Sequence, residues 1–413
     1  MSKRVVVTGM GAVSPLGLSA SDSWKHAVEG VSGVGPITLF DASDLLVQIA
    51  CEVKDFDPEV YIEFKETRRR DRFEQFGAAA AQQALAHSGL EITPENAGRI
   101  AVIISSAVGG IGTFQVAVET LHAQGARRLS PFMIPMFMGN GAAGTVAIDI
   151  GAKGPSFSVA SACASGADGI GQAWTLIRAG VIDAAVAGGA EATLTKVGVA
   201  SFDRLGALSR RNDDYKNTPQ PFDRNRDGLV MGEGGAALVI ESLEHAQARG
   251  AEILGEVVGY AATADAFHIT APSEDGEGGA AAIVAALNMA HLHAEDVDYV
   301  NAHGTGTQLN DLSETRAIKA ALGEHAHKVA ISSTKSMTGH MMGATGALEA
   351  IFCLMAIREG VVPPTIHYSE PDPDCDLDYV PNEARRMPVE VAISNAFGFG
   401  GHNAVLVFKA LSG

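Results

Sequence analysis

The sequence predicts an α/β fold, and two patterns along the chain support this prediction. Short β-branched runs alternate with alanine-rich stretches whose apolar residues recur at helical spacing, which is typical of sheets covered by helices on both faces. A faint repeat also relates residues 163–182 to residues 343–362, at an offset of 180 residues. Chance matching of alanine- and glycine-rich helices could produce several of the identities. We favour a duplication, which would place the two repeated helices near a pseudo-twofold axis.

The expected elements follow one another in order. We expect strands at residues 4–8, 99–104, 156–160, 184–187, 236–240, 297–301, 329–333, 389–394 and 404–408. Helical spacing of apolar residues predicts helices at residues 73–88, 164–179, 278–291 and 345–358. Residues 209–227 are polar and contain two prolines, which predicts a surface loop.

Composition and charge exclude several classes of protein. The chain has 413 residues, of which 46% are hydrophobic and 19% charged, so it can bury a large core and resembles no disordered sequence. A formal net charge of −18 argues against binding to nucleic acid or to an anionic membrane surface. No apolar run is long enough to span a bilayer, and the first residues resemble no signal or transit segment, so we expect a cytoplasmic protein. The four cysteines form no CxxC pair, which argues against a zinc or redox site of that kind.

Cys163 lies in 158-SVASACASGADGIG-171, between an expected strand and an expected helix. The free amides and the dipole of a helix start favour an anion, so we expect the pKa of this thiol to be lowered. The flanking alanine, serine and glycine residues would let a substrate come close. This local pattern alone fits an inert core thiol as well as a nucleophile.

Two histidines share one setting, since each follows an expected strand and lies beside threonine and glycine. His303 lies in 299-YVNAHGTGTQLND-311, and His340 lies in 331-ISSTKSMTGHMMGATGALE-349. Strand ends are where sites form in α/β folds, so both are candidate functional residues. Lys335 could be a surface lysine, or a buried one paired with a carboxylate such as Glu349. A metal site of His303, His340 and a carboxylate is disfavoured, because no ligand pair has i, i+4 spacing on one helix.

Two glycine-rich segments resemble nucleotide-binding loops without meeting the full pattern. The segment 393-ISNAFGFGGHNAVLVF-408 lacks the Lys-Ser/Thr of a phosphate loop. In 5-VVVTGMGAVSPLG-17, serine stands where a dinucleotide fingerprint has its third glycine. The first segment would still let a ligand approach the backbone closely.

In the order SACASG, NAHGTGT, STKSMTGH and NAFGFGG, these motifs resemble the β-ketoacyl-acyl-carrier-protein synthases over essentially the whole chain. The likeness is closest to their elongating, type II branch. It implies the thiolase fold, a duplicated αβαβα five-layer sandwich that forms a homodimer. Residues 1–250 would form the half with the nucleophilic cysteine, and residues 251–413 the half with both histidines and the Gly-Phe loop. No cofactor and no metal are implied.

The resemblance also implies a role for each motif residue. Cys163 would be the nucleophile, with the backbone N–H groups of Cys163 and Phe399 as an oxyanion hole. His303 and His340 would donate hydrogen bonds to a malonyl thioester, and Lys335 would set the electrostatics around them. Phe399 would gate the acyl pocket and Val108 would set its floor. Further expected substrate-binding residues are His268, Thr270, Thr305, Thr307, Phe397, Gly398 and Gly400, and expected structural or electrostatic residues are Asp311, Glu314 and Glu349.

The implied partner is an acidic acyl carrier protein, which carries both the acyl and the malonyl group. The basic stretch 65-KETRRRDR-72 stands out against the net charge of −18. We expect docking on Lys65, Arg68, Arg69, Arg127 and Arg128, although most charge runs are only solvated helix faces.

Other members of the wider superfamily fit less well. A second cysteine in the C-terminal glycine loop would indicate a thiolase, and an asparagine in place of His340 an initiating synthase. A non-catalytic chain-length factor would lack Cys163, whereas a polyketide ketosynthase is poorly separated by sequence. SSAVGG replaces the family's more frequent GTGxGG beside the acyl pocket, so the preferred chain length stays open.

Overall fold

The structure is a computed structural model that describes residues 2–411, and its strands fall into two sets with the same topology. The first set runs β5-β4-β6-β7-β1 and the second runs β10-β9-β13-β14-β8. In both sets the first two neighbouring pairs are parallel and the last two are antiparallel. The matching order establishes that the chain is built from two similar halves. The first set comprises β1 (Val5–Val13), β4 (Ile100–Ser105), β5 (Ser156–Phe157), β6 (Ala184–Glu191) and β7 (Gly234–Ser242). The second comprises β8 (Gly255–Ala264), β9 (Tyr299–Asn301), β10 (Ala330–Ser332), β13 (Val391–Gly398) and β14 (His402–Lys409).

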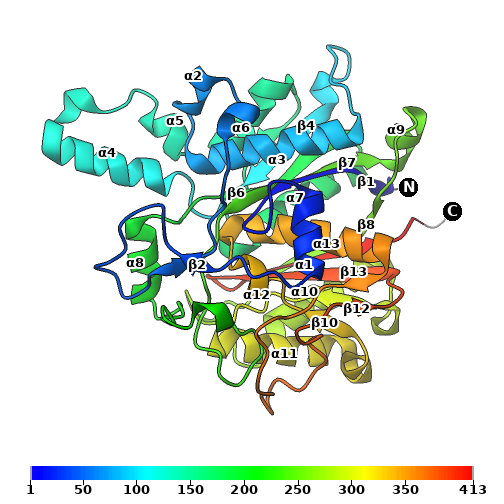
Figure 1. Cartoon of the computed structure of the whole chain (residues 1–413). Helices are drawn as coiled ribbons and strands as arrows, with labels where there is room; N and C mark the ends of the chain where they lie inside the picture. Colours follow the sequence, from blue (N-terminus) through cyan, green and yellow to red (C-terminus); the bar gives the residue numbers. More distant parts are fainter. Residues whose placement is uncertain (1, 412–413) are drawn as a thin grey trace.

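The two sets enclose a central pair of helices and carry further helices on their outer faces (Figure 1). The central helices are α7 (Ser165–Arg178) and α13 (Thr345–Glu359); α3 (Arg72–Ser88) and α6 (Gly141–Ile150) cover one outer face, and α10 (Glu277–Ala290) and α11 (Gln308–Leu322) cover the other. Three separate apolar cores fill the spaces between these layers. The layers are therefore αβαβα, as expected. Strands β1 and β8 also pair briefly, which joins the two sets into one ten-stranded sheet.

The remaining elements are short or lie at the edges of the sandwich. The helices are α1 (Ala20–Val28), α2 (Phe64–Thr67), α4 (Ile111–Gln124), α5 (Met133–Phe137), α8 (Lys196–Arg204), α9 (Leu243–Ala248) and α12 (Lys335–Thr338). The strands are β2 (Gly35–Pro36), β3 (Ile49–Ala50), β11 (Val361–Val362) and β12 (Arg385–Arg386). Helices α4 and α5 project from the body as an arm, at the upper left of Figure 1. Within residues 2–411, no helix is long and apolar enough to cross a membrane.

Helices α7 and α13 pack closely because glycines lie where they approach each other. A Cβ atom at Gly166 would lie 2.6 Å from the carbonyl oxygen of Gly343, and one at Gly346 would lie 3.0 Å from Ala167. Each helix is preceded by a single 3-10 turn, Ala162–Ala164 before α7 and Met342–Ala344 before α13. Ala162 and Met342 are 180 residues apart, and both have positive φ, +50° and +46°. The 180-residue repeat is thus visible in the backbone itself.

Two local expectations were wrong. The strand expected at residues 156–160 is only two residues long, because the chain leaves the sheet edge before the turn that carries Cys163. The segment 209–227 is more than a surface loop, because its second part is buried. Asp223 accepts hydrogen bonds from the amides of Ser369 and Glu370, and the ring of Phe222 stacks on Tyr379 at 4.0 Å.

Candidate active site

Cys163 lies in the 3-10 turn that leads into α7 and is only 7% exposed. The end of β13 comes close to it, since a Cβ atom at Gly398 would lie 3.0 Å from the Cys163 nitrogen. The backbone N–H groups of Phe399 and of Cys163 itself lie close enough to the thiol sulfur to favour its anionic form. Two backbone amides thus lie beside the sulfur.

The expected lowering of the Cys163 pKa is wrong for this structure. Burial raises the pKa of the thiol to about 11, although the Phe399 amide and the charge of Lys335 act in the opposite direction. The desolvation cost of a thiolate in this closed site exceeds what the helix start and two amides return. Cys163 is therefore a thiol at neutral pH.

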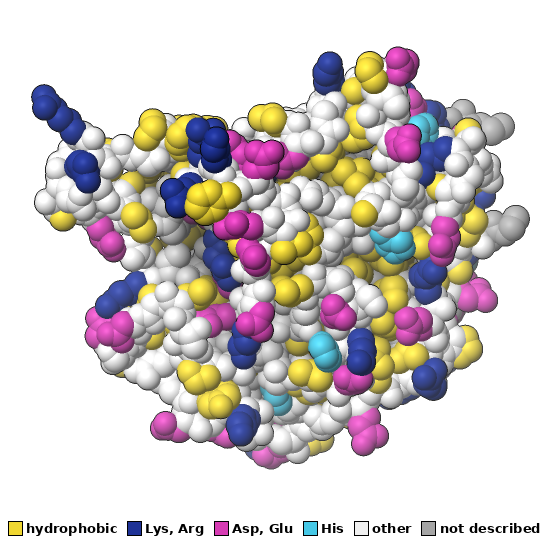
Figure 2. Space-filling view, turned by 45° about the horizontal axis from the view of Figure 1, so that its top comes forward, with side chains coloured by type: hydrophobic (Ala, Val, Ile, Leu, Met, Phe, Trp, Pro, Cys, Tyr) yellow, Lys and Arg dark blue, Asp and Glu magenta, His cyan; other side chains and the backbone are white. Residues whose placement is uncertain are grey.

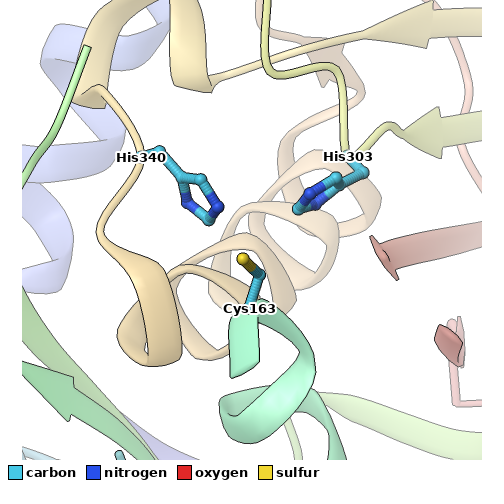
Figure 3. A group of neighbouring side chains, drawn as sticks. All are labelled: Cys163, His303 and His340. Atoms are coloured by element: carbon cyan, nitrogen blue, oxygen red, sulfur yellow. The ribbon is translucent and has the colours of Figure 1, made fainter. Parts of the chain in front are cut away.

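His303 and His340 face the sulfur from the other side (Figure 3). One side-chain atom from each of Cys163, His303 and His340 lies within 4.8 Å of the other two, and all three residues are buried. The two imidazole rings stand edge to face at 84°, with centroids 5.3 Å apart. Burial and the nearby Lys335 charge hold both histidine pKa values well below the ordinary value, so both rings are neutral. The same three residues have the spacing of metal ligands, in a set that the sequence did not suggest.

The hydrogen bonds of His340 define which of its nitrogens carries the proton. The Met342 amide donates to His340 Nδ1 at 3.2 Å, and the Thr345 hydroxyl lies 3.1 Å from the same atom. An amide N–H can only donate, so Nδ1 of the neutral ring accepts and the proton lies on Nε2. This Nε2 is buried and has no partner among the described residues, which leaves its N–H available to a substrate.

Two buried carboxylates hold the loop that carries His303. Glu314 accepts hydrogen bonds from the His303 and Gly304 amides at 2.7 and 2.6 Å, and burial raises its pKa to about 7. Asp311 accepts from the amides of Thr305 and Gly306 at 3.0 and 3.2 Å. These contacts fix the direction of the loop after β9, in keeping with the structural role expected for both acids.

Lys335 and Glu349 form a fully buried ion pair behind the histidines. Lys335 Nζ lies 2.6 Å from Glu349 Oε1, and each side chain is at most 2% exposed. Burial raises the pKa of Glu349 to about 7 despite the neighbouring ammonium. Of the two possibilities for Lys335, the structure shows the buried pair.

A cavity of about 280 Å³ opens onto the three residues. Its lining includes the expected residues Thr270, Thr305, Thr307, Phe397, Gly398 and Phe399. Phe202 and Met342 also line it, and sequence reasoning missed both: Met342 adjoins the KSMTGH motif, while nothing in the sequence marks Phe202. The rings of Phe202 and Phe399 stack with centroids 6.3 Å apart.

Three expected substrate-binding residues do not line this cavity. Val108 is 38% exposed at the start of the α4 arm. His268 is exposed and orders a turn, since its Nδ1 accepts from the Thr270 and Ala271 amides. Gly400 donates its amide to the Ile269 carbonyl. His268 and Gly400 therefore support the segment 269–271 next to the cavity without lining it.

The five expected docking residues, Lys65, Arg68, Arg69, Arg127 and Arg128, are all exposed. The guanidinium groups of Arg68 and Arg69 lie over the rings of Phe64 and Phe132, at 4.4 and 4.8 Å. Basic and apolar side chains are accordingly neighbours on this part of the surface (Figure 2). Not every basic residue of the run is available: Arg70 is buried against Asp149, and Arg72 pairs with Glu233.

Comparison with known proteins agrees with this geometry. Residues 2–246 match the family model "Beta-ketoacyl synthase, N-terminal domain", and residues 254–369 match "Beta-ketoacyl synthase, C-terminal domain". The chain is 51% identical over 407 residues to 3-oxoacyl-[acyl-carrier-protein] synthase 2 of Synechocystis, covering 98% of each chain.

Solved structures give the same result. The fold is similar to a beta-ketoacyl synthase from Burkholderia phymatum, with a TM-score of 0.92 and 36% identity over 99% of this chain and 100% of that chain. It is also similar to a type II PKS ketosynthase solved with its acyl-carrier protein, with a TM-score of 0.91 and 34% identity over the whole of both chains.

Proposed function

The chain belongs to the beta-ketoacyl synthase family, and we propose that Cys163, His303 and His340 carry out its reaction. The protein is an acyltransferase, similar over nearly its whole length to proteins named 3-oxoacyl-[acyl-carrier-protein] synthase 2. It condenses malonyl-carrier protein with a cysteine-bound acyl chain, releases CO₂ and lengthens the chain by two carbons. The observation that carries our assignment of roles is the convergence of one thiol and two neutral imidazoles within 4.8 Å.

The first step transfers the acyl group to Cys163. Because the thiol is protonated at neutral pH, its proton must leave as the sulfur attacks the thioester carbonyl. His303 is the available base, since His340 already carries a proton on Nε2. The amides of Cys163 and Phe399 stabilise the oxyanion, the carrier's C–S bond breaks, and the carrier thiolate takes the proton back from His303.

The second step uses the two histidines as hydrogen-bond donors. Malonyl-carrier protein places its thioester oxygen between the rings, and the bond to CO₂ breaks. The electron pair becomes an enolate that the His340 Nε2–H stabilises, together with the His303 N–H once the neutral His303 ring has changed tautomer and carries its proton on the nitrogen that faces the substrate. The enolate carbon attacks the acyl carbonyl, the bond to Cys163 breaks, and the released thiolate takes one proton from solvent water. The Lys335–Glu349 pair keeps both rings neutral and in place. We propose no cofactor and no metal for this chemistry, and a cytoplasmic location.

One assay tests this function. The protein is incubated with acyl-carrier proteins of graded chain length and malonyl-carrier protein, and both protein and products are weighed by mass spectrometry. We expect an acyl adduct on Cys163, products longer by two carbons, and neither with Cys163→Ala. Absence of adduct and extension in the unaltered protein would refute the proposal, and conversion of polyketide intermediates alone would favour a polyketide ketosynthase.

The exposed basic residues Lys65, Arg68, Arg69, Arg127 and Arg128 support docking of the acidic carrier protein on this face. Reversal of Lys65, Arg68 and Arg69 to glutamate should raise the KM for carrier-bound substrate at least tenfold, because rim charges govern encounter. The kcat should change little, and added salt should weaken binding by the unaltered protein. Lys25→Glu, on the exposed face of α1, is the matched control. An unchanged KM in the triple variant would remove this docking surface.

A further inference from the structure

Glu191 is a fully buried carboxylate close to the site that the proposed reaction does not use. It ends β6, and its side chain accepts hydrogen bonds from two separate turns. From the turn after β4, the Ser106 hydroxyl donates at 2.8 Å and the Ala107 amide at 2.7 Å. From the turn before α13, the Gly343 amide donates at 3.1 Å. The carboxylate thus ties together three segments that are far apart in sequence.

The contact between Glu191 and Gly343 lies at the position in the second half that corresponds to Cys163 in the first half. Strands β6 and β13 hold the same place in the two halves, and Gly343 lies 180 residues after Cys163. In the first half, the end of β13 lies beside the Cys163 amide, next to the reaction centre. In the second half, the carboxylate at the end of β6 lies on the Gly343 amide. The counterpart of the reactive centre is therefore filled by the carboxyl group of Glu191.

Glu191 and the Ala107 backbone pack closely around Gly343. A Cβ atom there would lie 2.7 Å from Glu191 Oε2 and 2.5 Å from the Ala107 nitrogen. The position that matches Cys163 accordingly has no room for a side chain between Glu191 and the Ala107 backbone.

The turn that Glu191 holds is the one that orients His340. Met342, the residue before Gly343, has a φ of +46°, a conformation that is strained for a methionine. Its amide donates to His340 Nδ1 and so keeps the proton on Nε2. The hydrogen bond from the Gly343 amide to Glu191 connects this strained turn to β6, and without it the turn could move.

We propose that Glu191 is a positioning residue, which holds the Met342–Ala344 turn so that His340 presents its Nε2–H to the substrate. Its catalytic consequence rests on the function proposed above. Loss of Glu191 should lower kcat for malonyl decarboxylation on the order of 10²-fold, because a displacement of about 1 Å has an effect of that size. The KM should change little, since Glu191 lies outside the cavity lining.

The tautomer of His340 can be tested without any turnover. In protein labelled with ¹⁵N-histidine, the His340 nitrogens are assigned by their loss in His340→Asn. We expect the unaltered protein to show a protonated Nε2 and an acceptor Nδ1. Glu191→Ala should shift this pair towards a mixture of tautomers. Glu191→Gln should retain the native pair and most of the activity, because its amide oxygen can still accept from Ala107 and Gly343.

A matched control separates positioning from general destabilisation. Glu241 is equally buried at the opposite end of the β6–β7 ladder, where Arg249 and His245 contact it. Glu241→Ala should lower stability yet leave the His340 signals and kcat unchanged. If Glu191→Ala does not fold, Gly343→Ala serves instead: its Cβ atom would lie 2.5 Å from the Ala107 nitrogen and 2.7 Å from Glu191 Oε2, so the same turn has to move, and the same spectrum reports the effect on His340.

The outcomes distinguish the two proposals. Unchanged His340 signals in folded Glu191→Ala or Gly343→Ala would overturn the positioning role, whatever the activity. If the unaltered protein fails to decarboxylate malonyl-carrier protein, the proposed function fails, while the ¹⁵N spectrum still decides whether Glu191 holds His340.

Discussion

Cys163 is the residue at which burial and a helix start act in opposite directions. Only the helix start is visible in the sequence, because the enclosure comes from β13 and the two histidine loops, which lie about 140 residues or more away along the chain. Burial prevails and raises the thiol pKa to about 11. In the reaction proposed above, Cys163 therefore has to lose its proton as the thioester binds.

This pKa predicts how alkylation of Cys163 depends on pH. Roughly one thiol in 10⁴ is ionised at pH 7, so the rate with iodoacetamide should rise about tenfold per pH unit between pH 7 and pH 10. The rate is followed by mass spectrometry, with Cys163→Ser to identify the adduct and glutathione as a free thiol. A plateau near pH 8 would contradict a raised pKa, because it would place the thiolate within the neutral range.

At the scale of elements, alternation of strands and helices was enough to predict the class of fold. The predicted helices 73–88, 164–179, 278–291 and 345–358 are each confirmed to within one residue at either end as α3, α7, α10 and α13. Their alanine-rich apolar faces repeat regularly, so their spacing is clear. By contrast, β8 and α11 were not predicted. The strand contains Gly255, Gly259 and three alanines, and the helix is polar because Asp311 and Glu314 turn inward to serve the site.

Site residues that lie in a sequence motif could be predicted, whereas residues that reach the site only through tertiary packing could not. Cys163, His303 and His340 each lie in a short glycine-rich motif, and the structure brings all three together. No motif surrounds Phe202 or Glu191 in the sequence. Phe202 reaches the cavity because α8 packs beside it, and Glu191 reaches the Gly343 amide because β6 ends there. Val108 was placed by resemblance, and its exposure shows that a single chain does not enclose it.

Close contact between α7 and α13 makes a prediction at this scale. Gly166→Ala would place a Cβ atom 2.6 Å from the Gly343 carbonyl, where the backbone cannot easily yield. Overpacking of this kind should lower the free energy of unfolding by about 1–3 kcal/mol and reduce activity, since the turns that lead into the two helices carry Cys163 and Met342. The measurement is urea unfolding at a fixed protein concentration.

Gly144→Ala provides the matched control, in a different helix. A Cβ atom at Gly144 on α6 would have nothing within 4 Å, so this substitution should raise the free energy of unfolding by about 0.5–1 kcal/mol. If Gly166→Ala did not lower the free energy of unfolding relative to Gly144→Ala, the glycines of the central helices would not be required for their close packing.

At the scale of the whole molecule, two parts of the surface differ from the rest of this acidic protein, one in charge and one in hydrophobicity. One is the basic face proposed for the carrier protein, which includes Arg127 and Arg128 between α4 and α5. The other is the remainder of the α4–α5 arm with the adjoining α6, where many apolar side chains are exposed: Val108, Phe114, Val116, Val118, Leu121, Phe132, Ile134, Met138 and, on α6, Ile148. Helix α4 has no buried residue at all. Soluble monomers rarely leave so many apolar residues uncovered on one segment, so we infer that a second copy of the chain covers the arm.

Covering the arm would also enclose Val108, at the position where family resemblance implies the floor of the acyl pocket. A double substitution, Val116→Glu with Ile148→Glu, tests this assembly, because the two side chains are 60% and 79% exposed and their change leaves the monomer core intact. Two carboxylates buried at an interface without partners should each cost several kcal/mol and prevent association. Light scattering after gel filtration should then report the mass of one chain, 42.7 kDa, whereas the unaltered protein should report twice that mass. Leu46→Glu, 61% exposed on a different segment, should remain a dimer. A double variant that keeps the mass of the unaltered protein would show that this arm is not the dimer interface.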